Sequence, residues 1–137
     1  MKTICLSILL IALSSSLCAQ NLLGYKEDKI EKYIEKNNKD LVKDTETRNE
    51  KYDYLKYTDG FSGTTTVYFF LDANGRCKRI KKMYVHSIKD EIIEELNRNY
   101  TPAGDNKWTD IKKGSKALIR LNNEEWFFTV TIEPASK

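Results

Sequence analysis

The stretch RCKRIKK, residues 76–82, holds the densest group of side chains able to bind an anion, and it directly follows the turn sequence DANG. Its cations are Arg76, Lys78, Arg79, Lys81 and Lys82. Two interpretations are open. Lysine-rich edge strands prevent a sheet from pairing with other chains, and basic residues protect an adjacent aggregation-prone strand such as TVYFFL. Alternatively, these cations hold an anionic surface with the help of Tyr84 and Tyr68.

Side chains of a strand point alternately to opposite faces of a sheet. In the expected strand RCKRIKKMYV, one face carries Lys78, Ile80, Lys82 and Tyr84, and the other carries Cys77, Arg79, Lys81, Met83 and Val85. Because cations fall on both faces, we expect the first half of this strand not to be fully buried.

Cys77 and His86 are the residues best suited to act as a nucleophile and its base. They flank the same expected strand, which would separate them by roughly 30 Å at about 3.3 Å per residue, whereas a catalytic pair must be in contact. We therefore expect Cys77 to be a small, half-buried residue beside the turn and His86 to be a loop residue.

Metal and phosphate sites have no recognisable motif in this sequence. The CxxC, HxxxH and EF-hand patterns are absent, and so are glycine-rich phosphate loops. Calcium binding through carboxylates such as Asp105 and Asp110 stays open. The adjacent acids at 94–95 and 124–125 point in different directions and do not make a general acid–base pair. We predict no metal, no cofactor and no enzymatic activity.

Aromatic residues form a second candidate binding surface. We expect most of them in the core, because aromatic side chains supply much of the buried area of a small sheet. A sheet covered by helices on one face leaves the other face open, however, and aromatic residues there would form a flat docking surface. The candidates are Tyr54, Tyr68, Tyr84 and Trp126.

Apolar periodicity predicts the elements that position these residues. Helical spacing predicts one helix over about residues 26–38 and a second that begins at Ser87, where SIKD approximates a capping box. An Asn-Gly pair at residues 74–75 predicts a hairpin. Strands are expected where β-branched and aromatic residues concentrate, within residues 52–59, 64–72, 76–85, 108–111, 117–123 and 125–133.

The resulting order is a helix and three strands, followed by a second helix and three strands. The two halves, about residues 22–85 and 86–134, align loosely as pseudo-repeats. We therefore predict an α+β fold of two helix-then-three-strand units that form one mostly antiparallel sheet, with two helices packed on one face. Because TVYFFL has bulky side chains on both faces, we expect it to be a central strand.

Residues 1–19 predict a secretory signal peptide, with one early cation, a short apolar run and small residues before the cleavage site. The apolar run is about ten residues, whereas a membrane-spanning helix needs about twenty. We place cleavage after Ala19, which leaves residues 20–137 as a single periplasmic or secreted domain. Acylation of Cys18, as in a lipoprotein, is an alternative that the large residue Leu17 disfavours.

Removal of residues 1–19 takes away Lys2 and lowers the formal charge from +3 to +2. So small an excess predicts no nucleic-acid partner. Of the three cysteines in the whole chain, Cys77 alone remains in the mature chain, so the domain must fold without an internal disulfide.

The segments LLGYKEDKIEKYIEKN and TVYFFLDANGRCKRI resemble small secreted proteins of Bacteroidota-type bacteria, in which a short helix precedes a strand pair ending in a pattern like Y-x-F-x-x-N-G-x-C. A single helix–strand unit of this kind is similar to the small lipoproteins of outer-membrane assembly. The tandem arrangement resembles β-lactamase-inhibitor-like domains, although this chain lacks their disulfides. The resemblance implies an envelope or inhibitor-type binding module.

From these residues we predict an exported, non-enzymatic binding module. It would recognise a protein or an anionic envelope component through the open sheet face or the basic edge strand. One alternative is an accessory structural subunit of an envelope assembly that acts by strand addition or oligomerisation. A hydrolase built on convergent carboxylates is a third hypothesis.

Overall fold

The computed structural model describes residues 21–45, 53–60, 62–112 and 114–135. The predicted signal peptide and its cleavage site lie outside these residues. The elements in chain order are α1 (Glu27–Asn37), β1 (Leu41–Asp44), β2 (Tyr54–Asp59), β3 (Thr65–Leu71), β4 (Cys77–Val85), the 3₁₀-helix η1 (His86–Ile88), α2 (Lys89–Asn99), β5 (Thr101–Gly104), β6 (Lys107–Lys112), β7 (Ser115–Asn123) and β8 (Phe127–Pro134).

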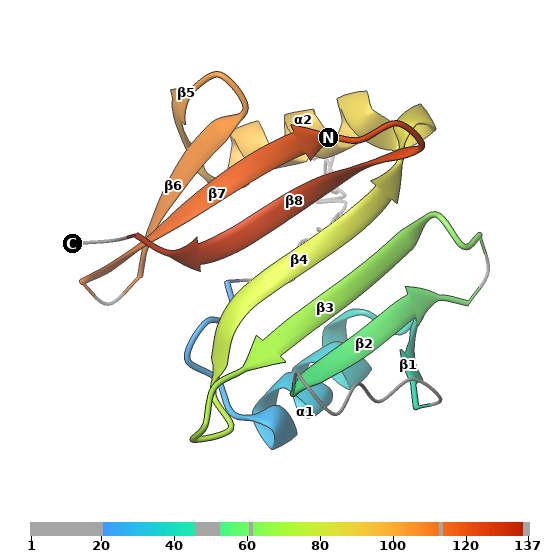
Figure 1. Cartoon of the computed structure of the whole chain (residues 1–137), viewed down its shortest axis with the longest axis vertical. Coiled ribbons are helices and arrows are strands. Elements are labelled where there is room, and N and C mark those ends of the chain that lie inside the picture. The colour runs from blue at the N-terminus through green and yellow to red at the C-terminus, as the bar shows by residue number, and fades with distance from the viewer. Residues whose placement is uncertain (1–20, 46–52, 61, 113, 136–137) are drawn as a thin grey trace, which may run out of the picture.

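These strands form one eight-stranded sheet in the order β1-β2-β3-β4-β8-β7-β6-β5 (Figure 1). Every neighbouring pair is antiparallel. The strands β1 to β4 and β5 to β8 each make a meander, and the pairing of β4 with β8 joins the two meanders. The predicted α+β class and antiparallel sheet are confirmed, but four strands rather than three follow each helix.

The two strands that the sequence did not predict lie at the two edges of the sheet. β1 has only four residues, LVKD, which is too short for alternation to reveal it. β5 contains Pro102 and Gly104, residues that signal a turn. Its hairpin with β6 turns through Gly104 (φ 133°) and Asn106 (φ 55°), which are residue types that tolerate positive φ.

The hydrophobic core lies between the sheet and the two helices, which Figure 1 shows behind the sheet. α1 contributes Ile30 and Ile34, and α2 contributes Leu96, all of them buried. Alternation along the strands supplies the other side of the core, because every second residue points toward the helices. In β3, the third of the eight strands, the core residues are Val67, Phe69 and Leu71.

The predicted serine cap of the second helix is wrong. A 3₁₀ turn, η1, precedes α2, and the residue before the helix is Ile88, which makes no side-chain cap hydrogen bond. Acidic residues Asp90 and Glu91 occupy the first turn of α2, where their charge is favourable to the helix dipole. The helix start therefore depends on charge and on the preceding turn.

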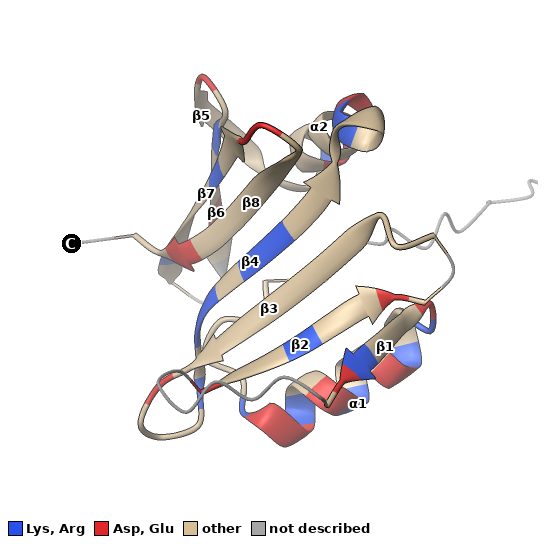
Figure 2. Cartoon of the chain, turned by 45° about the vertical axis from the view of Figure 1, so that its right-hand side comes forward, with Lys and Arg blue, Asp and Glu red and all other residues tan. Residues whose placement is uncertain are grey.

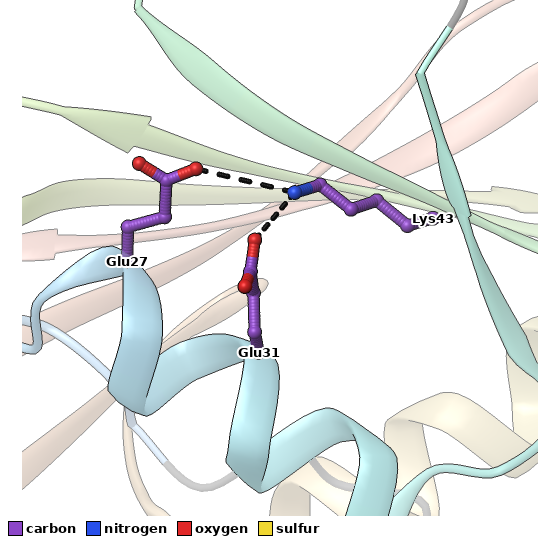
Figure 3. Close-up of polar contacts among 3 residues, drawn as sticks. All are labelled: Glu27, Glu31 and Lys43. Carbon is purple, nitrogen blue, oxygen red and sulfur yellow. Dashed lines mark hydrogen bonds and ion pairs between the residues drawn. The ribbon is translucent and has the colours of Figure 1, made fainter.

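An ion pair holds α1 against the edge strand β1 (Figure 3). The Lys43 ammonium contacts the Glu31 carboxylate and lies 4.0 Å from Glu27 Oε1. Lys43 is on the helix side of its strand, whereas Asp44 points to the opposite side and pairs with Lys56. Because the side chains of the α1 pair are partly exposed, we expect it to contribute at most about 1 kcal/mol.

The strand that carries RCKRIKK is not an edge strand, which corrects the expectation of a basic edge. β4 pairs with β3 on one side, and residues 80–85 pair with β8 on the other. At the start of β4, the second side is covered by the segment before α1. There Gly24 N donates to Cys77 O at 2.7 Å, and Cys77 N donates to Tyr25 O at 2.9 Å.

A β-bulge at Lys78 changes the expected assignment of faces in β4. Phe70 pairs with Arg79 and Leu71 pairs with Cys77, so Lys78 is an extra residue between two regular pairs. Cys77 therefore joins Ile80 in the core, with 3% of its surface exposed. Simple alternation had placed Cys77 on the other face, because it did not allow for the inserted residue.

Candidate binding site on the open sheet face

The face of the sheet that points away from the helices, called the open face below, carries both aromatic and basic side chains. Its aromatic members are Tyr54 of β2 and Tyr68 and Phe70 of β3, which alternate with the core residues of those strands. All three are partly exposed. These three aromatic residues therefore lie outside the core, whereas Tyr57 and Trp108 are buried within it.

The three open-face rings form one contiguous cluster. Tyr54 and Tyr68 meet edge to face with centroids 5.6 Å apart, and Tyr68 and Phe70 are stacked at 6.0 Å. Tyr54 also lies 6.0 Å from Phe70. Such contacts between rings on adjacent strands stabilise a sheet and at the same time hold the rings in fixed orientations. A partner would therefore meet a preformed surface with little side-chain entropy to lose.

Cations cover both ends of this aromatic cluster. The Arg79 guanidinium carbon lies 4.4 Å from the Phe70 ring centroid, and Lys56 Nζ lies 5.9 Å from the Tyr68 centroid. Stacking on a ring leaves the N–H edges of a guanidinium able to bind an anion. Lys56 also donates to Asp44 at 3.0 Å, and this hydrogen bond raises the pKa of the Lys56 ammonium.

The strand register aligns further cations into a row across the open face, called the basic row below. Each member is the register partner of the next, on neighbouring strands from β2 to β6. The row consists of Lys56, Tyr68, Lys81, Thr131, Arg120 and Lys107. Since neighbouring strands lie about 4.8 Å apart, the row extends over roughly 24 Å. Figure 2 shows basic segments in blue on β2 and β4.

The structure separates the residues that the sequence analysis proposed as one binding site. It brings four of them together on the open face, namely Tyr54, Tyr68, Arg79 and Lys81. Lys82 and Tyr84 point to the opposite face, where both are buried. The Tyr84 ring stacks on Phe128 at a centroid distance of 5.3 Å, which gives it a packing role.

The remaining three candidates lie outside the aromatic cluster. Arg76 occupies the hairpin turn and donates from Nη1 to the Gly24 carbonyl at 3.0 Å, so it ties the turn to the segment before α1. Lys78 is exposed at the bulge. Trp126 lies in the turn between β7 and β8 with 79% of its surface exposed, rather than among the core residues of β8.

Sequence reasoning missed Lys56, Phe70, Arg120 and Lys107 as members of the open face. Phe70 could have been found, because it alternates with core residues in the same strand as Tyr68. Arg120 and Lys107 belong to strands that are distant in the chain from RCKRIKK. Their alignment with Lys81 depends on the pairing of β4 with β8, which no local pattern predicts.

Cys77 and His86, the two residues considered as a nucleophile and its base, lie at opposite ends of β4. Burial raises the pKa of the Cys77 thiol to about 12, so it remains protonated and is a poor nucleophile at neutral pH. His86 lies at the other end of β4, where its Nε2 is 2.9 Å from the Glu124 carbonyl oxygen. In the part of the chain that the structure describes, no group of three or more His, Cys, Asp or Glu side chains could hold a metal ion.

Comparison of the chain with protein-family models, with curated proteins and with solved structures finds no match. Among the described residues, no helix is both long enough and apolar enough to cross a membrane. The function is therefore inferred from the residues on the two faces of the sheet.

Proposed function

We propose that the mature chain is an exported, non-enzymatic binding module that recognises an anionic component of the cell envelope through its open face. The observation that carries this proposal is the basic row, whose cations flank a preformed aromatic cluster across neighbouring strands. Export rests on the signal peptide expected at residues 1–19 and on cleavage after Ala19.

An acidic polysaccharide is the partner that best fits this surface. The cations of the open face are distributed along a line across neighbouring strands, which suits an extended polymer with repeated negative charges. Arg79, Lys81 and Arg120 would pair with carboxylates. The exposed sides of Tyr68 and Phe70 would pack against the apolar faces of sugar rings, as aromatic side chains do at interfaces.

The test measures binding of the mature chain to a polyuronate, with neutral dextran as the comparison polymer. We expect binding to the polyuronate alone, with an affinity that falls as salt is raised from low to physiological concentration. The double variant Lys81→Gln with Arg120→Gln should bind about tenfold more weakly or worse, which corresponds to about 1.4 kcal/mol.

The matched control removes the same number of charges from α1, through Lys32→Gln and Lys36→Gln, because both side chains are exposed on the helix. This variant should bind the polyuronate as the parent does. Equal binding to dextran, or equal losses in the two double variants, would reject the open face as the site.

Strand addition, the alternative of an accessory assembly subunit, receives less support. The sheet edges are β1 and β5, each only four residues long. Short edge strands and edge prolines such as Pro102 are features that prevent pairing with other chains. A partner strand would find few regular backbone groups to bind at either edge.

We also infer that the chain consists of two related units, each a helix followed by an antiparallel meander. The order α1 with β1 to β4, then α2 with β5 to β8, supports this inference, as does the central pairing of β4 with β8. In such an arrangement the basic row draws residues from both units, so a single unit would present only half of the surface.

A further inference from the structure

A cavity of about 650 Å³ lies on the helix-covered side of the sheet, away from the open face. Its walls come from the end of α1, from α2 and from the core-facing side of β3 and β4. The residues that decide its chemistry are Asn38, Val67, Lys82, Ile88, Ile92 and Glu95. This volume is within the range of small-molecule sites, which are mostly apolar with a few placed polar groups.

Lys82 is the most unusual member of the cavity wall. Only 4% of its surface is exposed, and no hydrogen bond or ion pair joins it to another described residue. Since Lys82 lines the cavity, a molecule bound there can reach its ammonium group.

Two further polar groups in the same wall have unmet hydrogen-bonding capacity. Asn38 Oδ1 and Glu95 Oε1 are buried and have no hydrogen-bond partner. The backbone of Asn38 is fully engaged, since its N–H donates to Ile34 O at 2.8 Å and its carbonyl accepts from Leu41 N at 3.0 Å. The side-chain oxygens of Asn38 and Glu95 therefore both require a donor from outside the fold.

The polar groups in the cavity wall indicate which charges and hydrogen-bond donors a ligand should carry. The Lys82 ammonium can donate to an anion, while the buried oxygens of Asn38 and Glu95 lack N–H or O–H donors. A molecule with a carboxylate and an ammonium group meets both requirements, as an α-amino acid or a short peptide does. The apolar side chains of Ile88 and Ile92 line the space between the polar groups and suit an aliphatic stem.

The charges around the cavity favour a ligand with an additional positive charge. Four acidic residues line the cavity in addition to Glu95. Among the lining residues, Lys82 and Arg98 are the two cations. The four acids are Asp40, Asp59, Glu91 and Glu94. We propose that this cavity binds a basic amino acid, or a short peptide that contains one, with the ligand carboxylate on Lys82 and its amino groups on Glu95 and Asn38.

The test is calorimetry and thermal unfolding of the mature chain with L-lysine and with the dipeptide lysyl-lysine, which distinguish a free amino acid from a peptide. Spermidine supplies amines without a carboxylate, and glutarate supplies carboxylates without an amine. We expect heat of binding and a raised Tm with lysine or lysyl-lysine, and neither effect with spermidine or glutarate.

Lys82→Met and Lys81→Met form a matched pair, because the two lysines are adjacent and point to opposite faces. We expect Lys82→Met to abolish lysine and lysyl-lysine binding while the protein stays folded. Its polyuronate binding should be unchanged, which separates this site from the open face. Lys81→Met should retain the amino-acid or dipeptide binding of the parent.

Glu95→Gln provides a second variant that keeps the side-chain shape and removes the charge. We expect it to weaken binding of the basic ligand at least tenfold while the protein stays folded. The proposal is overturned if neither lysine nor lysyl-lysine binds the parent, if spermidine or glutarate binds equally well, or if Lys82→Met still binds the basic ligand.

Discussion

Lys81 and Lys82 are neighbours in the chain, yet they meet different environments. Lys81 is a partly exposed member of the basic row, with Tyr68 and Thr131 as its register partners. Lys82 is buried beneath the helices and borders the cavity. The functional meaning of each lysine in RCKRIKK therefore depends on the face to which it points, and residue type alone does not distinguish a surface cation from a buried one.

Cys77 has a measurable effect on the pH dependence of stability. Burial raises its pKa to about 12 from an ordinary value of 9.0, so the unfolded chain loses this proton at a lower pH than the native protein. The stabilisation is therefore complete below pH 9 and is lost as the pH rises toward 12. At pH 10 the thiol accounts for a loss of about 1.4 kcal/mol.

Urea unfolding of the parent and of Cys77→Ala at pH 8 and pH 10 checks this prediction. The parent should lose more free energy of unfolding between the two pH values than the variant does, by about 1.3 kcal/mol. Tyr57, whose pKa burial also raises to about 12, is present in both proteins and cancels in the comparison. Equal losses in parent and variant would contradict a buried, protonated thiol.

At the scale of elements, the bulge at Lys78 leads to a prediction about deletions. The pairs on either side, Phe70 with Arg79 and Leu71 with Cys77, become consecutive if Lys78 is removed, and every side chain keeps its face. We expect this deletion to cost about 1 kcal/mol. Deleting Lys81 instead moves Ile80 to the open face and Arg79 toward the core, which should cost about 3–5 kcal/mol.

The two deletions remove the same residue type from the same strand, so each controls for the other. Urea unfolding of both variants at neutral pH measures the difference in their free energies of unfolding. Losses of similar size would show that Lys78 is part of the regular strand pairing and that the bulge is absent in solution.

Strong local patterns explain why several elements could be predicted from the sequence. The apolar spacing of α1 and the alternation of TVYFFL both reflect one buried face, so their positions and core residues followed directly. The face assignment of Cys77 failed because one inserted residue shifts alternation. β1 and β5 were missed because four-residue strands with polar, proline or glycine residues carry almost no local signal.

Only some residues of the candidate sites could be predicted from the sequence. Tyr54 and Tyr68 could be named because aromatic residues alternate with core residues on their own strands. Arg120 joins the basic row through long-range register, and Asn38 meets Lys82 at the cavity through the packing of helices on the sheet. Contacts between distant segments are set by the whole fold, so a single sequence does not reveal them.

At the scale of the whole molecule, the sheet separates two surfaces of different chemistry. The open face carries cationic and aromatic side chains, whereas the cavity on the covered side has five acidic residues and one buried lysine among the residues that line it. The first suits an extended polyanion and the second a small basic ligand. Both include residues of β4, the strand that pairs with β8 at the centre of the sheet.

The central pairing of β4 with β8 also gives a prediction about incomplete chains. A chain that ends at Asn123 lacks β8 and leaves one side of β4 unpaired. We expect its aggregation, followed by light scattering, to become faster when Arg79→Thr and Lys81→Thr are introduced, because the strand then loses charges that oppose pairing with other chains. Unchanged scattering would argue against this role, and the same substitutions in the full chain should have little effect.

This arrangement has a consequence for the order of synthesis. β8 follows the seven other strands in the chain, although its place is in the middle of the sheet. A chain that emerges from its N-terminus completes β1 to β4 well before β8 exists, and during that interval β4 is an edge strand. Arg79 and Lys81 would thus protect an edge that exists only while the protein is being made, and on the proposed function the same side chains would contact a ligand once β8 has paired with β4.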